Sequence, residues 1–241
     1  MSRTAAVVPA AGRGERLGPG APKALRLLGG VPMLVHAVRA LASARSVDLV
    51  VIAAPEDGVD AVHALLAEHH LVDAGPGRAE TMVVAGGDTR QGSVARALVA
   101  LPLDVDVVLV HDAARPLVPV SLVDAVAAAV RAGSDAVVPG LPVADTIKGV
   151  DRAGVVTATL DRGLLRAIQT PQGFRRTTLT EAHAAADPDA PATDDAGLVE
   201  ALGGKVVVVP GHEEAFKVTR PLDLVLAEAV LARRRAAGVV G

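Results

Sequence analysis

The sequence predicts an α/β protein with a mostly parallel sheet and a β-hairpin that projects from it. Short apolar runs alternate with segments whose apolar residues recur at helical spacing, which is the pattern of strand–helix–strand units with right-handed crossovers. From Gly140 this alternation stops, and two strand-like segments, 145–150 and 155–160, are joined by the turn 151–154. Strands joined by a turn form a hairpin. The 241 residues are enough for one sizeable core.

The expected elements follow from local pattern. Val47–Ala54 and Val105–Val110 are nearly continuous apolar runs, as in strands buried on both faces. Pro32 is placed to start a helix, since proline fits a first helical turn. We expect further strands at 4–8, 81–85, 135–139 and, as a last central strand, 206–209; helices at 33–41, 58–70, 94–101, 119–132, 177–186, from 193, and 222–235; a returning segment at 164–169; and a polar connection at 170–174.

The composition excludes several functional classes. No cysteine is present, which removes disulfides, thiolate zinc sites and a cysteine nucleophile. With two Phe, no Trp, no Tyr and a formal net charge of −3, the chain has neither stacking platforms nor a basic surface, so we expect no nucleic-acid partner. The N-terminal stretch lacks a signal-peptide pattern and no apolar run is long enough to span a bilayer. We therefore expect a cytoplasmic protein without a membrane partner.

A glycine-rich loop directly after the first strand is the main candidate site. Pro9 closes that strand, and the loop that follows ends at Lys23. Glycines allow positive φ angles and leave successive N–H groups uncovered, while cationic side chains add donors. The sequence therefore predicts a cradle for a polyanion, most plausibly a nucleoside triphosphate. Its glycines are Gly12, Gly14, Gly18 and Gly20, and its cations are Arg13, Arg16 and Lys23.

Two common glycine-loop chemistries fit this stretch poorly. A Walker loop needs a Gly-Lys-Ser/Thr sequence, which does not occur here. A dinucleotide fingerprint needs a third glycine where Leu17 stands. A plain strand-to-helix connection is the remaining alternative, but such a connection has no need of so many glycines and cations together.

A second polar glycine loop, 86–93, follows the expected strand 81–85. In a parallel sheet it would line the same crevice as the first loop. Asp88, Gln91 and Ser93 suit a base or a ribose, and Asp88 alone could instead begin the next helix. Both interpretations of this loop stay open.

Asp112 lies at the carboxyl end of a central strand, where an α/β enzyme holds Mg²⁺ and a ribose through oxygen ligands. The alternative is a structural ion pair between Asp112 and Arg115. His111 is expected to be a packed, hydrogen-bonded residue, and Asp194 and Asp195 are expected to cap the helix that starts there.

Taken together, the motifs resemble a known family, the 2-C-methyl-D-erythritol 4-phosphate cytidylyltransferases, over essentially the full length. The resemblance implies a Rossmann-like nucleotidyltransferase domain over 1–241, with a β-arm at about 140–165. It also implies a homodimer joined by these arms, CTP and methylerythritol phosphate as substrates, and Mg²⁺ as cofactor. The matching residues are Pro9-Ala10-Ala11-Gly12-x-Gly14-x-Arg16-Leu17, Pro22-Lys23, Gly87-Asp88-x-Arg90-x-x-Ser93, His111-Asp112-Ala113-Ala114-Arg115-Pro116, Asp145-Thr146-Ile147-Lys148, Thr170-Pro171-Gln172, Thr193-Asp194-Asp195-Ala196 and Lys217-Val218-Thr219-x-Pro221.

The same resemblance implies a role for each matching residue. Arg16 and Lys23 would offset the charge of the triphosphate, and Arg162 and Lys217 would clamp the sugar phosphate. Thr146 and Arg162 would come from the neighbouring subunit's arm. Asp112 would face the ribose and the metal ion. The remaining nucleotide-binding residues would be Pro9, Ala10, Ala11, Gly12, Gly14, Gly87, Asp88, Ser93 and Arg115.

One position departs from the pattern of this family. Ala215 stands where many relatives carry an asparagine, two residues before Lys217. Two other functions stay open at this stage: a sister cytidylyltransferase acting on another polyol phosphate such as ribitol 5-phosphate, and a nucleotide-binding module without turnover.

Overall fold

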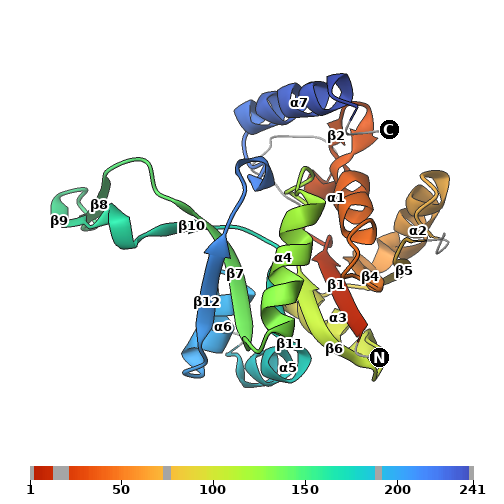
Figure 1. Ribbon diagram of the computed structural model, residues 1–241, viewed down its shortest axis with the longest axis horizontal. Helices are drawn as coiled ribbons and strands as arrows, with labels where there is room; N and C mark the ends of the chain where they lie inside the picture. The colour runs from red at the N-terminus through yellow and green to blue at the C-terminus, as the bar shows by residue number, and fades with distance from the viewer. Residues whose placement is uncertain (1–2, 13–21, 73–76, 188–191, 239–241) are drawn as a thin grey trace.

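The computed structural model describes residues 3–12, 22–72, 77–187 and 192–238, and it has the predicted α/β architecture (Figure 1). An eight-stranded sheet runs in the order β10-β7-β11-β6-β1-β4-β5, with β12 also paired to β7. The ladders β1–β4, β1–β6, β4–β5 and β7–β12 are parallel. The strands are β1 Arg3–Pro9, β4 Leu49–Ala54, β5 Glu80–Ala85, β6 Val105–Val110, β7 Ala136–Pro142, β10 Arg166–Ile168, β11 Gln172–Arg175 and β12 Val206–Pro210.

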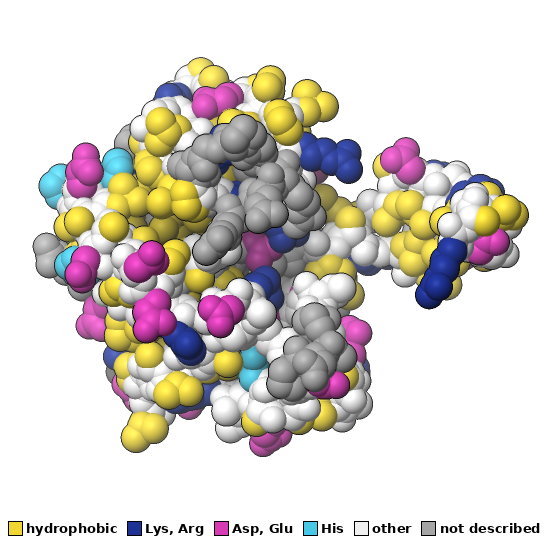
Figure 2. Space-filling model, turned by 180° about the vertical axis from the view of Figure 1, so that it is seen from behind, with side chains coloured by type: hydrophobic (Ala, Val, Ile, Leu, Met, Phe, Trp, Pro, Cys, Tyr) yellow, Lys and Arg dark blue, Asp and Glu magenta, His cyan; other side chains and the backbone are white. Residues whose placement is uncertain are grey.

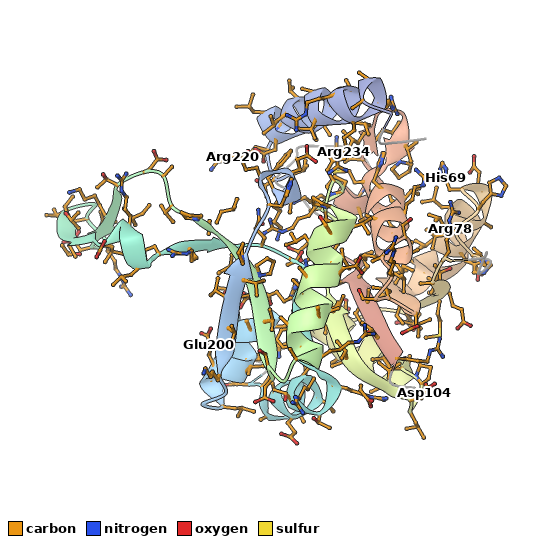
Figure 3. The ribbon with its side chains drawn as sticks, in the orientation of Figure 1. His69, Arg78, Asp104, Glu200, Arg220 and Arg234 are labelled. Atoms are coloured by element: carbon orange, nitrogen blue, oxygen red, sulfur yellow. The ribbon has the colours of Figure 1, made fainter. Side chains whose placement is uncertain are left out.

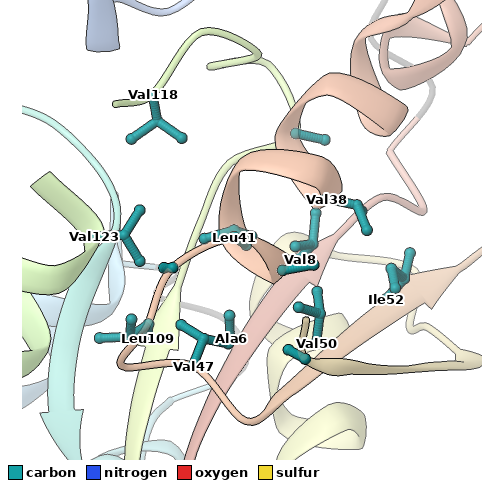
Figure 4. Close-up of a cluster of buried hydrophobic side chains, with 14 of the residues drawn as sticks. Ala6, Val8, Val38, Leu41, Val47, Val50, Ile52, Leu109, Val118 and Val123 are labelled. Atoms are coloured by element: carbon teal, nitrogen blue, oxygen red, sulfur yellow. The ribbon is translucent and has the colours of Figure 1, made fainter. Parts of the chain in front are cut away.

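Helices cover both faces of the sheet because its central strands are apolar on both sides. Buried side chains of helices α1, α2 and α4 pack with Ala6, Val8 and Ile52 on one face, part of which is shown in Figure 4. Side chains of α3, α5 and α6 pack with Val7 and Phe174 on the other. The helices are α1 Met33–Ala42, α2 Val59–Glu68, α3 Arg90–Ala100, α4 Val120–Arg131, α5 Arg176–Ala185, α6 Asp195–Ala201 and α7 Pro221–Ala236.

The terminal helix α7 packs against the segment that leads into α1. Its buried residues Ala227 and Leu231 join a small apolar cluster with Leu28, Met33 and Val218. Leu28 belongs to a two-stranded ladder, β2 Leu27–Leu28 with β3 Val31–Pro32, that the sequence pattern did not indicate. Helix α7 thereby fixes the segment before it, which contains Lys217.

The predicted hairpin is confirmed. Strands β8 Ile147–Val150 and β9 Val156–Leu160 pair antiparallel, with Ile147 opposite Leu160, and Figure 1 shows them projecting well away from the sheet. Several of the apolar side chains on this arm are exposed, among them Val150, Val156 and Leu164. In the described ranges no helix is long and apolar enough to cross a bilayer.

Two expectations about strands were wrong. Residues 170–174 are not a plain connection, because Gln172–Arg175 forms β11, which inserts antiparallel between β6 and β7 and buries Phe174 completely. A run with one apolar residue gives no strand periodicity, so pattern analysis missed it. Strand β12 is not central, since its pairing within the described chain is with β7 alone and Val208 is exposed.

Gly173 lets β11 lie close beneath helix α4. A Cβ atom there would lie 2.7 Å from Val126 Cγ1 and 2.9 Å from Val130 Cγ2. We expect Gly173→Ala to lower the free energy of unfolding by about 1–3 kcal/mol, because overpacking forces neighbouring side chains to shift. Urea unfolding monitored by circular dichroism measures this change.

Gly58→Ala is the matched control, because a Cβ at Gly58 would meet Pro55 atoms at an ordinary 3.4 Å. That variant should stay within about 0.5 kcal/mol of the wild type, as surface substitutions do. Equal stability of the two variants would contradict the close packing assigned to Gly173.

Candidate active site

A pocket of about 180 Å³ opens at the carboxyl ends of β1 and β6. This is the edge of a parallel sheet at which ligands bind in open α/β folds. Acidic and basic side chains meet in a hollow on the face shown in Figure 2. The pocket brings together many of the residues singled out in the sequence, namely Pro9, Ala10, Ala11, Gly12, Lys23, Ser93, Asp112 and Lys217, and adds Arg90.

Asp112 is the buried carboxylate of this pocket, and two cations engage it. Lys217 Nζ lies 2.7 Å from Asp112 Oδ2, and Arg90 Nε lies 3.1 Å from Oδ1. Burial alone would raise the pKa of Asp112, but the positive charges of Arg90 and Lys217 outweigh it and hold that pKa well below its usual range. The carboxylate therefore stays ionised and orients Lys217 in the pocket.

His111 supports the main chain at Asp112. The Thr170 hydroxyl accepts a hydrogen bond from the Asp112 N–H at 3.0 Å and lies 3.0 Å from His111 Nδ1, while His111 Nε2 lies 3.2 Å from the carbonyl oxygen of Arg115. This set of partners is satisfied when the ring is neutral and Nε2 carries its proton. Burial is the main cause that lowers the pKa of His111 to about 4. The expectation of a packed histidine is confirmed.

Arg115 connects three segments behind the pocket. Its guanidinium donates hydrogen bonds to the carbonyl oxygens of Ala215 at 2.7 Å and Ile168 at 3.2 Å, and its Nε lies 4.0 Å from Asp112 Oδ2. It is absent from the pocket lining within the described ranges. These contacts support the structural interpretation of the Asp112–Arg115 pair. Ala215 is fully buried, so the position that departs from the family pattern belongs to the core.

Sequence reasoning missed the ion pair behind Arg90. Asp194 caps α6 as expected, accepting a hydrogen bond from the Gly197 N–H at 2.9 Å. The buried carboxylate of Asp195 does more than interact with the helix end, because it lies 2.7 Å from Arg90 Nη1 and 2.9 Å from His183 Nε2. The sequence held one clue to this contact, since Arg90 belongs to the Gly87–Ser93 motif. Helix capping, however, was already a sufficient explanation for the presence of Asp195. Arg90 thus links Asp195 to Asp112.

The second glycine loop is held together by Ser93. Its hydroxyl donates to the Gly87 carbonyl at 3.1 Å and accepts from the Gly87 N–H at 3.1 Å. The residue that caps α3 is Thr89, whose hydroxyl accepts from the Gly92 N–H, so the capping alternative for Asp88 was wrong. Asp88 is exposed. A Cβ at Gly87 would come within 2.8 Å of the Gly92 main chain, which explains the glycine.

Some predicted site residues are not brought to this pocket. Thr146 and Arg162 lie in the projecting arm, where Arg162 is exposed and donates to the carbonyl oxygen of Ala144 at 2.5 Å. Gly14 and Arg16 lie outside the described residues, so the structure does not bear on them.

The pocket can be tested for its fit to a magnesium ion. Groups of three or more carboxylate, histidine or cysteine ligands do not occur among the described residues. Mg²⁺ bound with nucleotides is usually held by one or two carboxylates together with phosphate oxygens and water. Asp112 is an ionised carboxylate that lines the pocket together with cationic side chains, so it fits the role of a single protein ligand for a metal that arrives with a triphosphate.

Comparisons with known proteins agree on one family. Residues 4–233 match the family described as IspD, 2-C-methyl-D-erythritol 4-phosphate cytidylyltransferase. The enzyme of that name from Streptomyces avermitilis is 63% identical over 240 residues, covering 97% of this chain and 94% of the relative.

Solved structures give the same result. The 2-C-methyl-D-erythritol 4-phosphate cytidylyltransferase of Thermus thermophilus is 39% identical with a TM-score of 0.74, covering 97% of this chain and 100% of that one. The 4-diphosphocytidyl-2C-methyl-D-erythritol synthase of Anaerococcus prevotii is 27% identical with a TM-score of 0.80, covering 96% and 99%.

The buried His111 makes stability depend on pH. Its pKa is 6.5 as a free side chain and about 4 in the folded protein, so the unfolded chain binds the proton more readily. The resulting stabilisation is fully present above pH 6.5 and is lost as the pH falls toward 4, an effect of about 3 kcal/mol. Urea unfolding at pH 7, 5.5 and 4.5 measures the free energy of unfolding across this range. Between pH 7 and 4.5 this free energy should fall less in His111→Gln than in the wild type.

Ile52→Val is the control, because it weakens the core by about 1 kcal/mol while His111 is retained. It should lower stability equally at each pH. If the stability of His111→Gln depended on pH as strongly as that of the wild type, the loss of stability at low pH would have to arise from other groups.

Proposed function

This chain belongs to the 2-C-methyl-D-erythritol 4-phosphate cytidylyltransferase family, and we propose that the pocket around Asp112 is its active site. The enzyme transfers CMP from CTP to 2-C-methyl-D-erythritol 4-phosphate in the biosynthesis of isoprenoid precursors, giving 4-diphosphocytidyl-2-C-methyl-D-erythritol and pyrophosphate. The single observation that carries the assignment of the site is the Lys217–Asp112 ion pair, 2.7 Å long, in the pocket that Lys23 also lines.

The reaction sets the electrostatic task of the pocket. An oxygen of the sugar phosphate forms a bond to the α-phosphorus of CTP, and the bond from that phosphorus to the bridging oxygen of the β-phosphate breaks. The nucleophile is already an anion, so no general base is needed. The barrier arises from repulsion between two anions and from charge that gathers as the pyrophosphate leaves, which positioned cations offset.

Lys23 and Lys217 supply those cations from opposite ends of the chain. We assign Lys23, together with Arg16 of the glycine loop, to the triphosphate, and Lys217 to the sugar phosphate. Preorganised cations of this kind contribute about 3–4 kcal/mol each to the transition state when water is excluded. Asp112 positions Lys217 through the 2.7 Å ion pair, and Arg90 and Asp195 position Asp112 in turn.

The nucleotide would lie along the two glycine loops. We assign the cytidine to Ala10, Ala11, Gly12 and the Gly87–Ser93 loop, where main-chain groups and a small pocket favour a pyrimidine. Asp112 would contact the ribose and hold Mg²⁺, which neutralises part of the charge on the triphosphate when it is bound. The roles of Pro9, Gly14 and Asp88 in nucleotide binding are part of the same proposal.

We further propose a single catalytic domain over residues 1–241, active as a homodimer in the cytoplasm. The arm at about 140–165 exposes apolar side chains, including Val150 and Val156, that a second subunit would cover. Thr146 and Arg162 of that arm would then reach the partner's active site, because their own arm projects away from the sheet (Figure 1). The dimer would therefore complete the site for the sugar phosphate.

Lys23→Ala tests the assignment to the triphosphate. We expect kcat to fall about 10²- to 10³-fold, with a smaller change in the dissociation constant of CTP, because the charge of Lys23 matters most in the transition state. Steady-state kinetics and equilibrium binding of CTP measure the two effects. Wild-type turnover would remove Lys23 from the proposed role.

Lys217→Ala tests the assignment to the sugar phosphate. The KM for methylerythritol phosphate should rise at least about 10-fold while CTP binding stays near that of the wild type, since the lost contact is to the acceptor. Lys205→Ala, at an exposed residue directly before β12, is the control and should leave both constants unchanged. Unchanged kinetics in Lys217→Ala would contradict the proposed site.

The reaction itself is tested by release of pyrophosphate from CTP and Mg²⁺ with either methylerythritol 4-phosphate or ribitol 5-phosphate. We expect release with methylerythritol 4-phosphate alone. Release only with ribitol 5-phosphate would keep the fold and the pocket but change the acceptor, and no release with either would favour a binding module without turnover.

A further inference from the structure

A second and larger cavity lies between α1, α4 and α7, on a part of the molecule that the reaction does not use. Its volume is about 750 Å³, within the range of small-molecule sites. The described residues that line it include none of those lining the pocket around Asp112. Two of its lining residues are labelled in Figure 3: Arg234, which belongs to α7, and Arg78, which lies on the other side of α1.

The walls of this cavity carry more positive than negative charge. Arg39, Arg78, Arg233 and Arg234 line it together with a single carboxylate among the described residues, that of Glu214. Glu214 is already engaged by Arg233 and Arg234, with 2.8 Å between its Oε2 and Arg234 Nε. This carboxylate therefore balances only the two arginines of α7.

The other two arginines are Arg39 and Arg78, for which no ion pair is found in the described part of the chain. They also act on one another: burial first, and then the positive charge of Arg78, lower the pKa of Arg39. Such mutual repulsion is relieved by an anion placed between the two guanidinium groups. Arginine forks match phosphate oxygens in particular.

The start of α4 adds hydrogen-bond donors to the same cavity. Pro119, Val120 and Ser121 line it, and Pro119 has no side chain that could cap the helix. Within the described chain no acceptor is found for the main-chain N–H groups of Val120 and Ser121. Free N–H groups at a helix start favour an anion, as does the positive end of the helix dipole. These N–H groups add to the argument that the cavity binds an anion, but the arginine side chains of its walls are the main argument.

The rest of the lining is largely apolar. Ala40, Pro119 and Val120 contribute partly exposed apolar side chains to the cavity, and Ala237 contributes an exposed one. Inorganic phosphate alone would leave these groups against water, whereas a short apolar part of a ligand would cover them. We propose that this cavity is a binding site for a small organic phosphate or diphosphate whose anionic group contacts Arg39 and Arg78 and whose apolar part contacts Ala40, Pro119 and Val120.

The experiment measures the thermal shift and isothermal titration of the full chain with n-butyl phosphate, inorganic phosphate and n-butanol. A ligand that binds the folded state raises the melting temperature by mass action. We expect saturable binding of n-butyl phosphate, binding of inorganic phosphate weaker by at least about 5-fold, and no response to n-butanol. Equal affinity for n-butyl phosphate and inorganic phosphate would overturn the apolar part of the proposal.

Variants separate the cavity from the active site. The double variant Arg39→Gln/Arg78→Gln should bind n-butyl phosphate at least about 10-fold more weakly than the wild type. Its kcat, measured without n-butyl phosphate, should be unchanged. The control Arg45→Gln, an exposed residue just after α1, should bind as the wild type does. Binding should persist in Lys23→Ala/Lys217→Ala. Loss of binding in that variant, or full binding in Arg39→Gln/Arg78→Gln, would place the probe elsewhere and overturn the proposal.

A second variant covers the case in which the double substitution does not fold. Ala40 lines the cavity from α1, so Ala40→Leu narrows it and changes no charge. This substitution should weaken the binding of n-butyl phosphate more than that of inorganic phosphate, because the leucine side chain occupies space that the apolar part of the ligand needs. Undiminished binding in this variant would contradict the assigned cavity.

Discussion

The buried charge of Asp112 is the constraint on which the rest of the site depends. A carboxylate removed from water is costly unless cations and hydrogen bonds compensate it. Arg90 and Lys217 provide the cations, and the Thr170 hydroxyl holds the main chain beneath it. Because Arg90 is itself half-buried, it needs a second carboxylate, which Asp195 supplies. The arrangement of several distant segments follows from keeping one carboxylate ionised.

The fold supplies these groups because parallel strands end at one edge. Strand β6 delivers Asp112 beside the loop that follows β1, and β11, inserted antiparallel between β6 and β7, brings Thr170 to the same place. Helix α7 then fixes Lys217 through the cluster around Leu231 and Val218. Asp112 is joined to several segments by these contacts, and the cations that line the pocket come from both ends of the chain. Such preorganisation is what a reaction between two anions requires.

Two surfaces lie outside the active-site pocket, and they differ in chemistry. The arm presents exposed apolar side chains, while the described walls of the cavity between α1, α4 and α7 carry arginines in excess of carboxylates. We propose a protein partner for the arm, which would cover its apolar side chains, and an anionic small molecule for the cavity, which would balance its positive charge.

The sequence by itself determined the α/β class and the hairpin, because these depend on periodicity and turn chemistry. It also placed Asp112 at the carboxyl end of a central strand, and the family resemblance singled out Lys217, which the structure brings to the same pocket. It did not indicate β11, whose short run has only Phe174 as an apolar signal, or the contact of Asp195 with Arg90, 105 residues away along the chain. Tertiary structure alone decided those features. A buried ion pair or an inserted strand depends on which segments meet in space, and local sequence carries no record of partners so far apart.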